Sequence, residues 1–334
     1  MGQGTLYALD NLVLEVHAEK QTREDLDHLL QELSWVRRAE HTARPALHLS
    51  VSSNNCKLSV PANCREVLRT DDFLGFEAND DFYLTDRSSI FHLRPAKREG
   101  YARLAPSFFT KPALTQGNFW FFGLLKLLRP LGIFSLHGAG LSARDGTGLL
   151  LVGASGSGKS TLAIGLIREG YKYLSDDAVL LRDGSLGVEA LACRRSFYVD
   201  PVRSSKYSDL LLGDEAPDPA GRERRRIDID QAYPERYIPR CIPRIMIFPK
   251  IKPRDNSRLM PVDRVLALRV LLAQSAPQLF DRNTMAQHLE LLKQLLQQTE
   301  TYALDAGRDL YREPVKLIDL LNEVQGEKIG ADRH

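Results

Sequence analysis

A run of nine residues near the middle of the chain has the composition of a loop that binds polyphosphate. It matches the P-loop pattern G-x-x-x-x-G-K-[ST], in which glycines let successive backbone N–H groups point at an anion. Its residues are Gly153, Ala154, Ser155, Gly156, Ser157, Gly158, Lys159, Ser160 and Thr161. We expect Lys159 to reach the β- and γ-phosphates and the Ser160 hydroxyl to bind Mg²⁺. The run therefore predicts a site for ATP, or another nucleoside triphosphate, with Mg²⁺.

The residues on either side of this run indicate which elements would position it. The apolar run Leu149 to Val152 predicts a strand before the loop. Residues 160–169 have the pattern of a helix, which Gly170 is well placed to end. A loop between a strand and a helix places free N–H groups and the positive end of the helix dipole at the anion. This context distinguishes the run from a chance Gly/Ser-rich turn.

An acidic pair follows the loop at a short distance. Asp176 and Asp177 come 17 and 18 residues after Lys159, enough for one helix, a turn and an adjacent strand. One carboxylate could hold Mg²⁺ and the other could accept a proton from an incoming hydroxyl. In isolation an Asp-Asp pair is more often a solvated turn, but the neighbouring phosphate loop favours the functional interpretation.

A histidine precedes the loop, on the strand predicted over residues 133–142. The small residues Gly138, Ala139 and Gly140 come directly after His137. A histidine in an apolar strand is commonly a packed structural group, but small neighbours would let a ligand approach closely. We interpret His137 as an active-site position. An Asp145-Gly146 turn signal then predicts a hairpin with the strand over 148–152.

A P-loop alone does not define a reaction. The sequence contains no Leu-Ser-Gly-Gly-Gln-type signature and no long apolar strand ending in Asp-Glu, which transporter-type ATPases carry. The acidic pair at residues 176–177 comes much closer to the loop instead. The sequence therefore disfavours a transporter-type ATPase.

Taken together, His137-Gly138, the loop from Gly153, and Asp176-Asp177 resemble the HPr kinase/phosphorylase family over about residues 130 to 182. The resemblance implies an α/β fold, with a P-loop core of the HPr kinase/phosphoenolpyruvate carboxykinase type. It implies a serine kinase in which Asp177 is the catalytic carboxylate, Asp176 its metal-binding partner and His137 an active-site residue. It also makes a homo-oligomer plausible.

Three features depart from that family. The loop ends in Ser160-Thr161 rather than Ser-Glu, and the N-terminal region looks unlike the family's regulatory domain. No Glu-x-Arg-Gly-type stretch is legible downstream, where Arg194 and Arg195 stand instead, either of them a phosphate contact or a surface charge. These departures weaken HPr as the substrate and phosphorylase as an activity. They fit the broader group of HPr kinase-like proteins, some of which resemble lasso-peptide precursor kinases.

The patterns divide the chain into two domains. Residues 1–110 predict a small α+β domain with a helix over residues 23–38 and short strands. We expect this domain to have a structural or substrate-recognition role. Residues 111–330 predict the kinase domain, which opens with a helix over residues 112–129. This division agrees with the length of the chain, because 334 residues are enough for about two domains of ordinary size.

The bulk composition is that of an ordinary globular protein and gives no sign of a nucleic-acid-binding or membrane protein. Hydrophobic residues make up 43% and charged residues 26% of the chain, as in an ordinary globular protein. A net charge of +2 gives no global argument for nucleic acid or membrane binding. The N-terminus lacks a signal-peptide pattern, which makes the cytoplasm the default. We expect free thiols at all four cysteines, which are Cys56, Cys64, Cys193 and Cys241.

A basic stretch lies in a region poor in large apolar residues. Residues 213–226 predict a mobile loop, and four arginines stand near its end, Arg222, Arg224, Arg225 and Arg226. The loop is either solvated or a lid that closes over phosphates or an acidic peptide, with Arg240 and Arg244 as possible additions.

Three functional hypotheses remain open. The first is ATP- and Mg²⁺-dependent phosphoryl transfer to a serine hydroxyl of a peptide or small protein. The second is a small-molecule kinase acting on a free amino acid or a sugar. The third is a nucleotide-gated regulatory module with slow hydrolysis.

Overall fold

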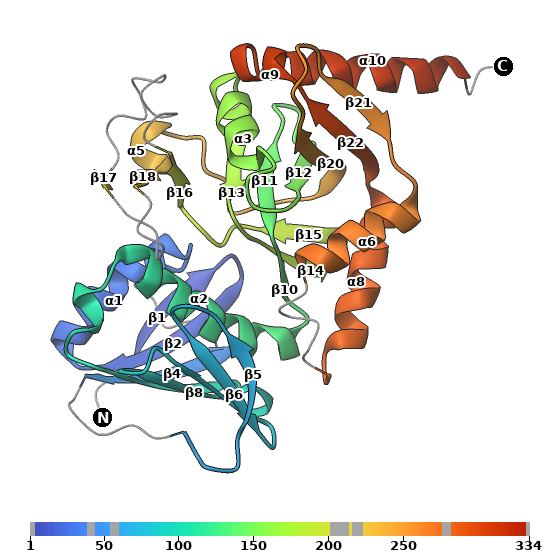
Figure 1. The fold of residues 1–334 in the computed structure, drawn as a ribbon. Coiled ribbons are helices and arrows are strands. Elements are labelled where there is room, and N and C mark those ends of the chain that lie inside the picture. The colour runs from blue at the N-terminus through green and yellow to red at the C-terminus, as the bar shows by residue number, and fades with distance from the viewer. Residues whose placement is uncertain are drawn as a thin grey trace. The chain divides into compact units, whose positions relative to one another are not determined.

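The computed structural model describes residues 4–38, 44–53, 60–200, 214–215, 223–275 and 282–331. It shows a mixed α/β protein with several sheets, as the sequence predicts (Figure 1). The chain divides into two compact units, each with its own core. The first unit comprises Met1–Phe134 and Tyr198–Ile227, and the second comprises Ser135–Phe197 and Asp228–His334.

The first unit is built on one large sheet with strand order β3-β1-β2-β4-β9-β8-β7-β6-β5. The strands are β1 Thr5–Leu9, β2 Leu12–Ala18, β3 Val36–Arg37, β4 Leu47–Ser53, β5 Arg65–Arg69, β6 Leu74–Ala78, β7 Asp81–Thr85, β8 Ile90–Arg94 and β9 Glu99–Leu104. The helices are α1 Lys20–Glu32 and α2 Ala113–Leu128, with short 3-10 helices at η1 Pro95–Lys97, η2 Phe108–Thr110 and η3 Arg129–Leu131.

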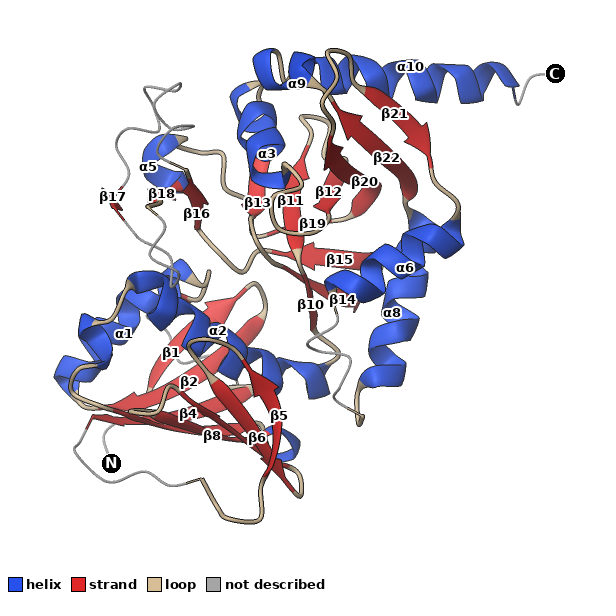
Figure 2. Cartoon of the chain, in the orientation of Figure 1, coloured by secondary structure: helices blue, strands red, loops and turns tan. Residues whose placement is uncertain are grey.

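Helix α2 belongs to this first unit because its apolar face packs on β7 and β8 (Figure 2). The Phe91 ring of β8 lies 5.0 Å from the Trp120 ring in an edge-on contact. Gly123 permits the close approach, since a Cβ there would stand 2.3 Å from the Phe91 ring. The domain boundary expected after residue 110 thus falls inside a compact unit.

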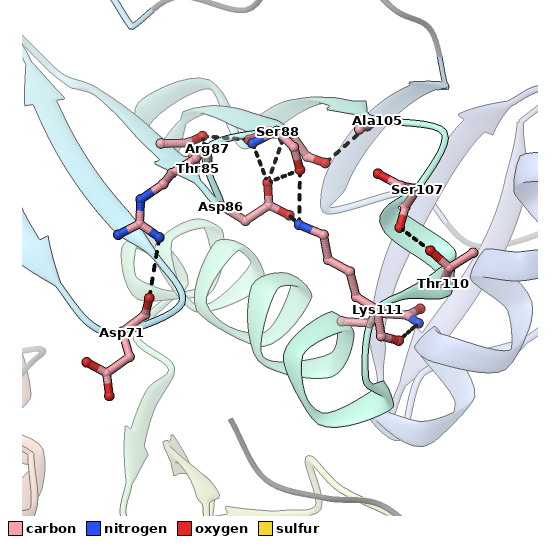
Figure 3. A network of polar contacts seen from close by, with 11 residues as sticks. Asp71, Thr85, Asp86, Arg87, Ser88, Ala105, Ser107, Thr110 and Lys111 are labelled. Atoms are coloured by element: carbon pink, nitrogen blue, oxygen red, sulfur yellow. Dashed lines mark hydrogen bonds and ion pairs between the residues drawn. The ribbon is translucent and has the colours of Figure 1, made fainter. Parts of the chain in front are cut away.

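A buried carboxylate joins the β7–β8 turn to the segment that leads into α2 (Figure 3). Asp86 Oδ1 accepts hydrogen bonds from the N–H groups of Ser88 and Ser89, and Asp86 Oδ2 lies 2.6 Å from Lys111 Nζ. Burial acts to raise the pKa of Asp86, but the Lys111 ammonium and the two N–H groups lower it on balance. Asp86 is therefore a structural anion of the first unit.

The second unit holds a six-stranded sheet, order β13-β11-β12-β20-β22-β21, and a four-stranded sheet, order β10-β14-β15-β19. The first sheet consists of β11 Gly138–Ser142, β12 Gly148–Val152, β13 Lys172–Ser175, β20 Pro243–Ile251, β21 Arg258–Pro261 and β22 Glu300–Ala306. The second consists of β10 Phe134–Leu136, β14 Val179–Gly184, β15 Gly187–Leu191 and β19 Arg240–Cys241. The helices are α3 Lys159–Arg168, α5 Ile229–Ala232, α6 Arg264–Gln274, α8 Met285–Gln298, α9 Arg308–Arg312 and α10 Lys316–Ala331.

The remaining sheet has the order β16-β18-β17. It shows that part of the region predicted as a loop, residues 213–226, forms strands. Its strands are β16 Ser196–Val199, β17 Asp214–Glu215 and β18 Arg225–Asp228. Arg225 and Arg226 pair in antiparallel register with β17, so they belong to a strand. Arg222 and most of the predicted loop lie outside the described residues.

Two other predictions differ from the structure for local reasons. The strand predicted over residues 133–142 is two strands, β10 and β11, interrupted at His137. The helix predicted over residues 23–38 ends at Glu32, and Ser34 then adopts φ +63°, a left-handed conformation that no helix continues through. Among the described helices, none combines the length and the apolar character needed to cross a membrane.

Candidate active site around the glycine-rich loop

Strand pairing in the second unit brings the predicted site residues to one edge of the six-stranded sheet. β11 runs antiparallel to β12, with Gly138 opposite Val152, and antiparallel to β13, with Gly140 opposite Ser175. The start of β11 therefore lies beside the ends of β12 and β13. His137 precedes β11, Gly153 follows β12 and Asp176 follows β13, so all three stand at that edge. Ligands of open α/β sheets commonly bind at such carboxyl ends.

The loop between β12 and α3 depends on glycine at two positions. Gly156 has φ +79° and Gly158 has φ +101°, in the region that glycine adopts without strain. Ala154, Ser155 and Gly156 are exposed, whereas Gly153 is buried. Helix α3 starts directly after Gly158, so its first N–H groups face the loop and favour an anion there.

Lys159 lies folded beneath this loop and is only 5% exposed. Its Nζ lies 2.7 Å from the Gly153 carbonyl oxygen, 3.0 Å from the Ala154 carbonyl oxygen and 3.1 Å from Nε2 of His137. Burial lowers the pKa of Lys159, and the charges of Asp176 and Asp177 act in the opposite direction. The ammonium is therefore bound by the loop carbonyls and His137 and is stabilised by the charges of the acidic pair.

The two ring nitrogens of His137 have different partners, which identifies the tautomer. Nδ1 lies 2.7 Å from the backbone carbonyl oxygen of Asp177, and a carbonyl can only accept, so Nδ1 carries the proton. Nε2 is then the acceptor for the Lys159 ammonium. Burial and the Lys159 charge lower the pKa of His137. The ring is therefore a neutral link between Lys159 and the backbone of Asp177.

Asp176 is buried, at 3% exposure. Burial first, and then the charge of Asp177, raise the pKa of Asp176 to about 7, while a hydrogen bond from the Ser160 side chain acts to lower it. Its Oδ1 has no hydrogen-bond partner among the described residues. A buried carboxylate oxygen without a partner beside a serine hydroxyl fits a hard cation, because Mg²⁺ binds oxygen ligands.

Asp177 is half-buried and has φ +63°, a left-handed conformation that aspartate tolerates better than most residues. Its backbone carbonyl is held by His137, as described above. Non-glycine residues in this conformation cluster at functional sites, where the surrounding structure holds them.

The structure separates the two arginines that the sequence left equivalent. Arg195 makes an ion pair of 2.6 Å with Asp230 and lies over the Tyr237 ring at 4.0 Å. Arg194 is buried, and its charge is one of the groups that lower the pKa of His137. Because Arg195 is paired with Asp230, Arg194 is the stronger candidate for a phosphate contact, a difference that spacing along the chain did not predict.

Ser175 is a supporting residue that sequence reasoning missed. The N–H of Arg194 donates to Ser175 Oγ at 3.1 Å, and the N–H of Cys193 lies 3.4 Å from the same oxygen. This side chain ties the segment carrying Arg194 to the end of β13. A buried serine next to an acidic pair was the only available signal.

The remaining predicted groups lie elsewhere or outside the described residues. Arg240 makes an ion pair of 3.8 Å with Glu189 on β15, and Arg244 is exposed on β20. Cys64, Cys193 and Cys241 are free thiols, as expected, and Cys56 lies outside the described residues. No cluster of three or more His, Cys, Asp or Glu side chains suited to a metal occurs in the part of the chain that the structure describes.

No family model matches this chain, and no curated protein matches it. Among solved structures, the chain is similar to the Hpr(Ser) kinase/phosphatase from Coxiella burnetii, with a TM-score of 0.33 and 14% sequence identity. The similarity covers 60% of this chain and 94% of that one. At this level a similarity establishes no activity, so the function has to be argued from the residues of the site.

Proposed function

We propose that this chain is an ATP- and Mg²⁺-dependent kinase that transfers the γ-phosphate to a serine hydroxyl of a peptide or small protein. One observation carries the proposal. Lys159 under the glycine-rich loop, His137 and the acidic pair Asp176-Asp177 meet at one sheet edge, although they come from three separate segments. A cation, an anion-binding loop and two carboxylates are the groups that phosphoryl transfer requires.

The loop and Lys159 would bind the phosphates. The N–H groups at the start of α3 would bind phosphate oxygens, and Lys159 Nζ is already within 3.1 Å of its acceptors in the loop and His137. Phosphate oxygens would replace the loop carbonyls as partners of the ammonium. Charge stabilisation of this kind is commonly the largest catalytic contribution.

Ser160 and Asp176 are the groups that would hold Mg²⁺, because a hydroxyl and a buried carboxylate oxygen suit this ion. When bound, the ion would neutralise charge on the β- and γ-phosphates. Mg²⁺ often takes only one or two carboxylates together with substrate phosphates. A site without a full cage of protein ligands is therefore suited to it.

Asp177 would act as the general base. The serine oxygen forms a bond to the γ-phosphorus, the bond from that phosphorus to the β–γ bridging oxygen breaks, and ADP leaves. The proton of the serine hydroxyl passes to the Asp177 carboxylate. His137 keeps the backbone of Asp177 in place through its Nδ1–H and orients Lys159 through Nε2.

The acceptor class rests on the resemblance of His137, the loop and the acidic pair to the HPr kinase/phosphorylase family. Labelled ATP incubated with HPr, a panel of serine peptides, free amino acids and sugars tests it. Label in a peptide or protein supports the proposal. Label only in a small molecule indicates a small-molecule kinase, and free phosphate regardless of acceptor indicates a regulatory ATPase.

The role of Asp177 is tested by Asp177→Asn, with Asp183→Asn on an exposed part of β14 as the matched control. We expect the first variant to lose at least about a hundredfold in transfer rate, the scale of general-base catalysis, while ATP binding is largely kept. The control should transfer at the wild-type rate. Near wild-type transfer by Asp177→Asn would show that another group is the base.

Lys159→Ala tests the loop itself. Removing the ammonium should weaken ATP binding and slow transfer together, because the same group contacts the phosphates in both the bound and the reacting states. Isothermal titration with ATP and Mg²⁺ measures the first effect. An unaltered ATP affinity would remove the basis for nucleotide binding at this loop.

A further inference from the structure

An exposed apolar side chain stands beside the glycine-rich loop, on the side away from the acidic pair. Ile251, the last residue of β20, is 54% exposed. A Cβ built on Gly158 would lie 3.4 Å from its Cγ1 and 3.7 Å from its Cδ1, so Ile251 borders the loop at the start of α3. A Cβ built on Gly153 would lie 3.6 Å from the carbonyl oxygen of Pro249, which is on the same strand as Ile251.

The order of the strands gives a bound nucleotide a direction. In the sequence β13-β11-β12-β20-β22, the loop follows the central strand β12. On one side of β12, His137 directly precedes β11, and Asp176 and Asp177 directly follow β13. β20 and β22 run parallel to β12 on the other side, so their carboxyl ends lie at the same edge. A γ-phosphate directed at the acidic pair therefore leaves the nucleoside to extend over β20 and β22.

The charges at those strand ends suit this direction. Asp305 at the end of β22 lies 3.9 Å from Lys252 Nζ and 3.3 Å from Arg254, and the exposed Lys250 stands next to Ile251. Asp255 pairs with Arg308 at 3.4 Å. The Asp309 carboxylate, next to Arg308, accepts hydrogen bonds from Ser257. Four cations against three carboxylates leave this edge with one excess positive charge, which favours the approach of a polyphosphate.

Resting on the kinase function proposed above, we propose that Ile251 contacts the face of the nucleobase and that the nucleoside lies over the carboxyl ends of β20 and β22. An aliphatic side chain packs against an aromatic ring but offers no hydrogen bond to its edge. This subsite therefore strengthens nucleotide binding without choosing between adenine and guanine.

The test compares ATP, GTP and inorganic tripolyphosphate, each with Mg²⁺, by isothermal titration of the full chain. Ile251→Thr keeps a β-branched side chain at the strand end and removes apolar surface. Val265→Thr is the matched control, because Val265 is 71% exposed on α6. We expect Ile251→Thr to weaken ATP and GTP alike by roughly threefold to tenfold, and tripolyphosphate by less than about twofold. The control should leave all three unchanged.

Three results would overturn the inference. If Ile251→Thr binds ATP within about twofold of wild type, the base does not contact this side chain. If ATP and tripolyphosphate weaken equally, the substitution has disturbed the phosphate loop. If wild-type protein binds neither ligand, the proposed kinase function fails together with the inference, whereas the first two results leave that function standing.

Discussion

Single residues at the loop edge are held by partners that determine their protonation. Nδ1 of His137 donates to the Asp177 carbonyl, which leaves Nε2 to accept from Lys159. Burial lowers the pKa of Lys159 and raises the pKa of Asp176. Opposite shifts in an acid and a base that share one site are typical of functional clusters. The surroundings of the site therefore shift the pKa values of these residues together.

The raised pKa of Asp176 predicts a pH-dependent difference in stability. The ordinary aspartate pKa is 3.8, and burial raises that of Asp176 to about 7. As the pH rises between these values, the unfolded state loses the proton while the folded state keeps it, so folding loses stability across this window. Asp176→Asn cannot titrate and avoids this loss.

We therefore expect the Tm of Asp176→Asn, relative to wild type, to increase between about pH 4 and pH 7 and to level off above. Each kcal/mol by which the variant's free energy of unfolding exceeds that of wild type raises the Tm by roughly 2 to 4 °C. Thermal unfolding without Mg²⁺ or nucleotide measures it, with Asp183→Asn as the control. A difference that stays flat or falls with pH would contradict the raised pKa.

Individual elements are joined by a few buried polar contacts. In the first unit, the Asp86 carboxylate connects the β7–β8 turn to the segment before α2. Its side chain is 3% exposed and that of Lys111 is 24% exposed. A buried carboxylate that loses its cation keeps its desolvation penalty without compensation.

Lys111→Met should consequently lower the free energy of unfolding by about 1 to 3 kcal/mol. The exposed Lys97 on η1 provides the control Lys97→Met. Urea titration of both variants at pH 7 measures the difference. Equal stability of the two variants would show that the ion pair with Asp86 contributes nothing.

At the scale of the whole molecule, two units with separate cores are expected to respond separately to a ligand. The loop and the acidic pair belong entirely to the second unit. A ligand at 100 times its Kd stabilises the state it binds by about 2.7 kcal/mol, and this protection is confined to the structure that opens cooperatively with the site.

Hydrogen exchange with ATP and Mg²⁺ should therefore slow in peptides from β12 and α3 and stay unchanged in peptides from β7, β8 and β9. In Lys159→Ala, treated identically, ATP and Mg²⁺ should not slow exchange in the peptides from β12 and α3. Equal protection of the first-unit strands would show that the two units respond to the nucleotide together.

The sequence by itself determined the features that depend on neighbours along the chain. The loop, the helix after it, the β11–β12 hairpin and α2 follow from glycine positions, turn residues and apolar spacing over a few consecutive residues. The acidic pair could be proposed because its distance from Lys159 matches one helix and one strand. The turn at Ser34, where φ is positive, ends the predicted helix over residues 23–38 without a strong local signal.

Only the tertiary structure decided which distant residues share a surface. Sheet order places Ile251 beside Gly158, and packing assigns α2 to the first unit. Arg194 is buried while Arg195 pairs with Asp230, although both arginines are adjacent in the chain. Local pattern carries no information on such pairings, because they depend on strand register and on partners tens of residues away.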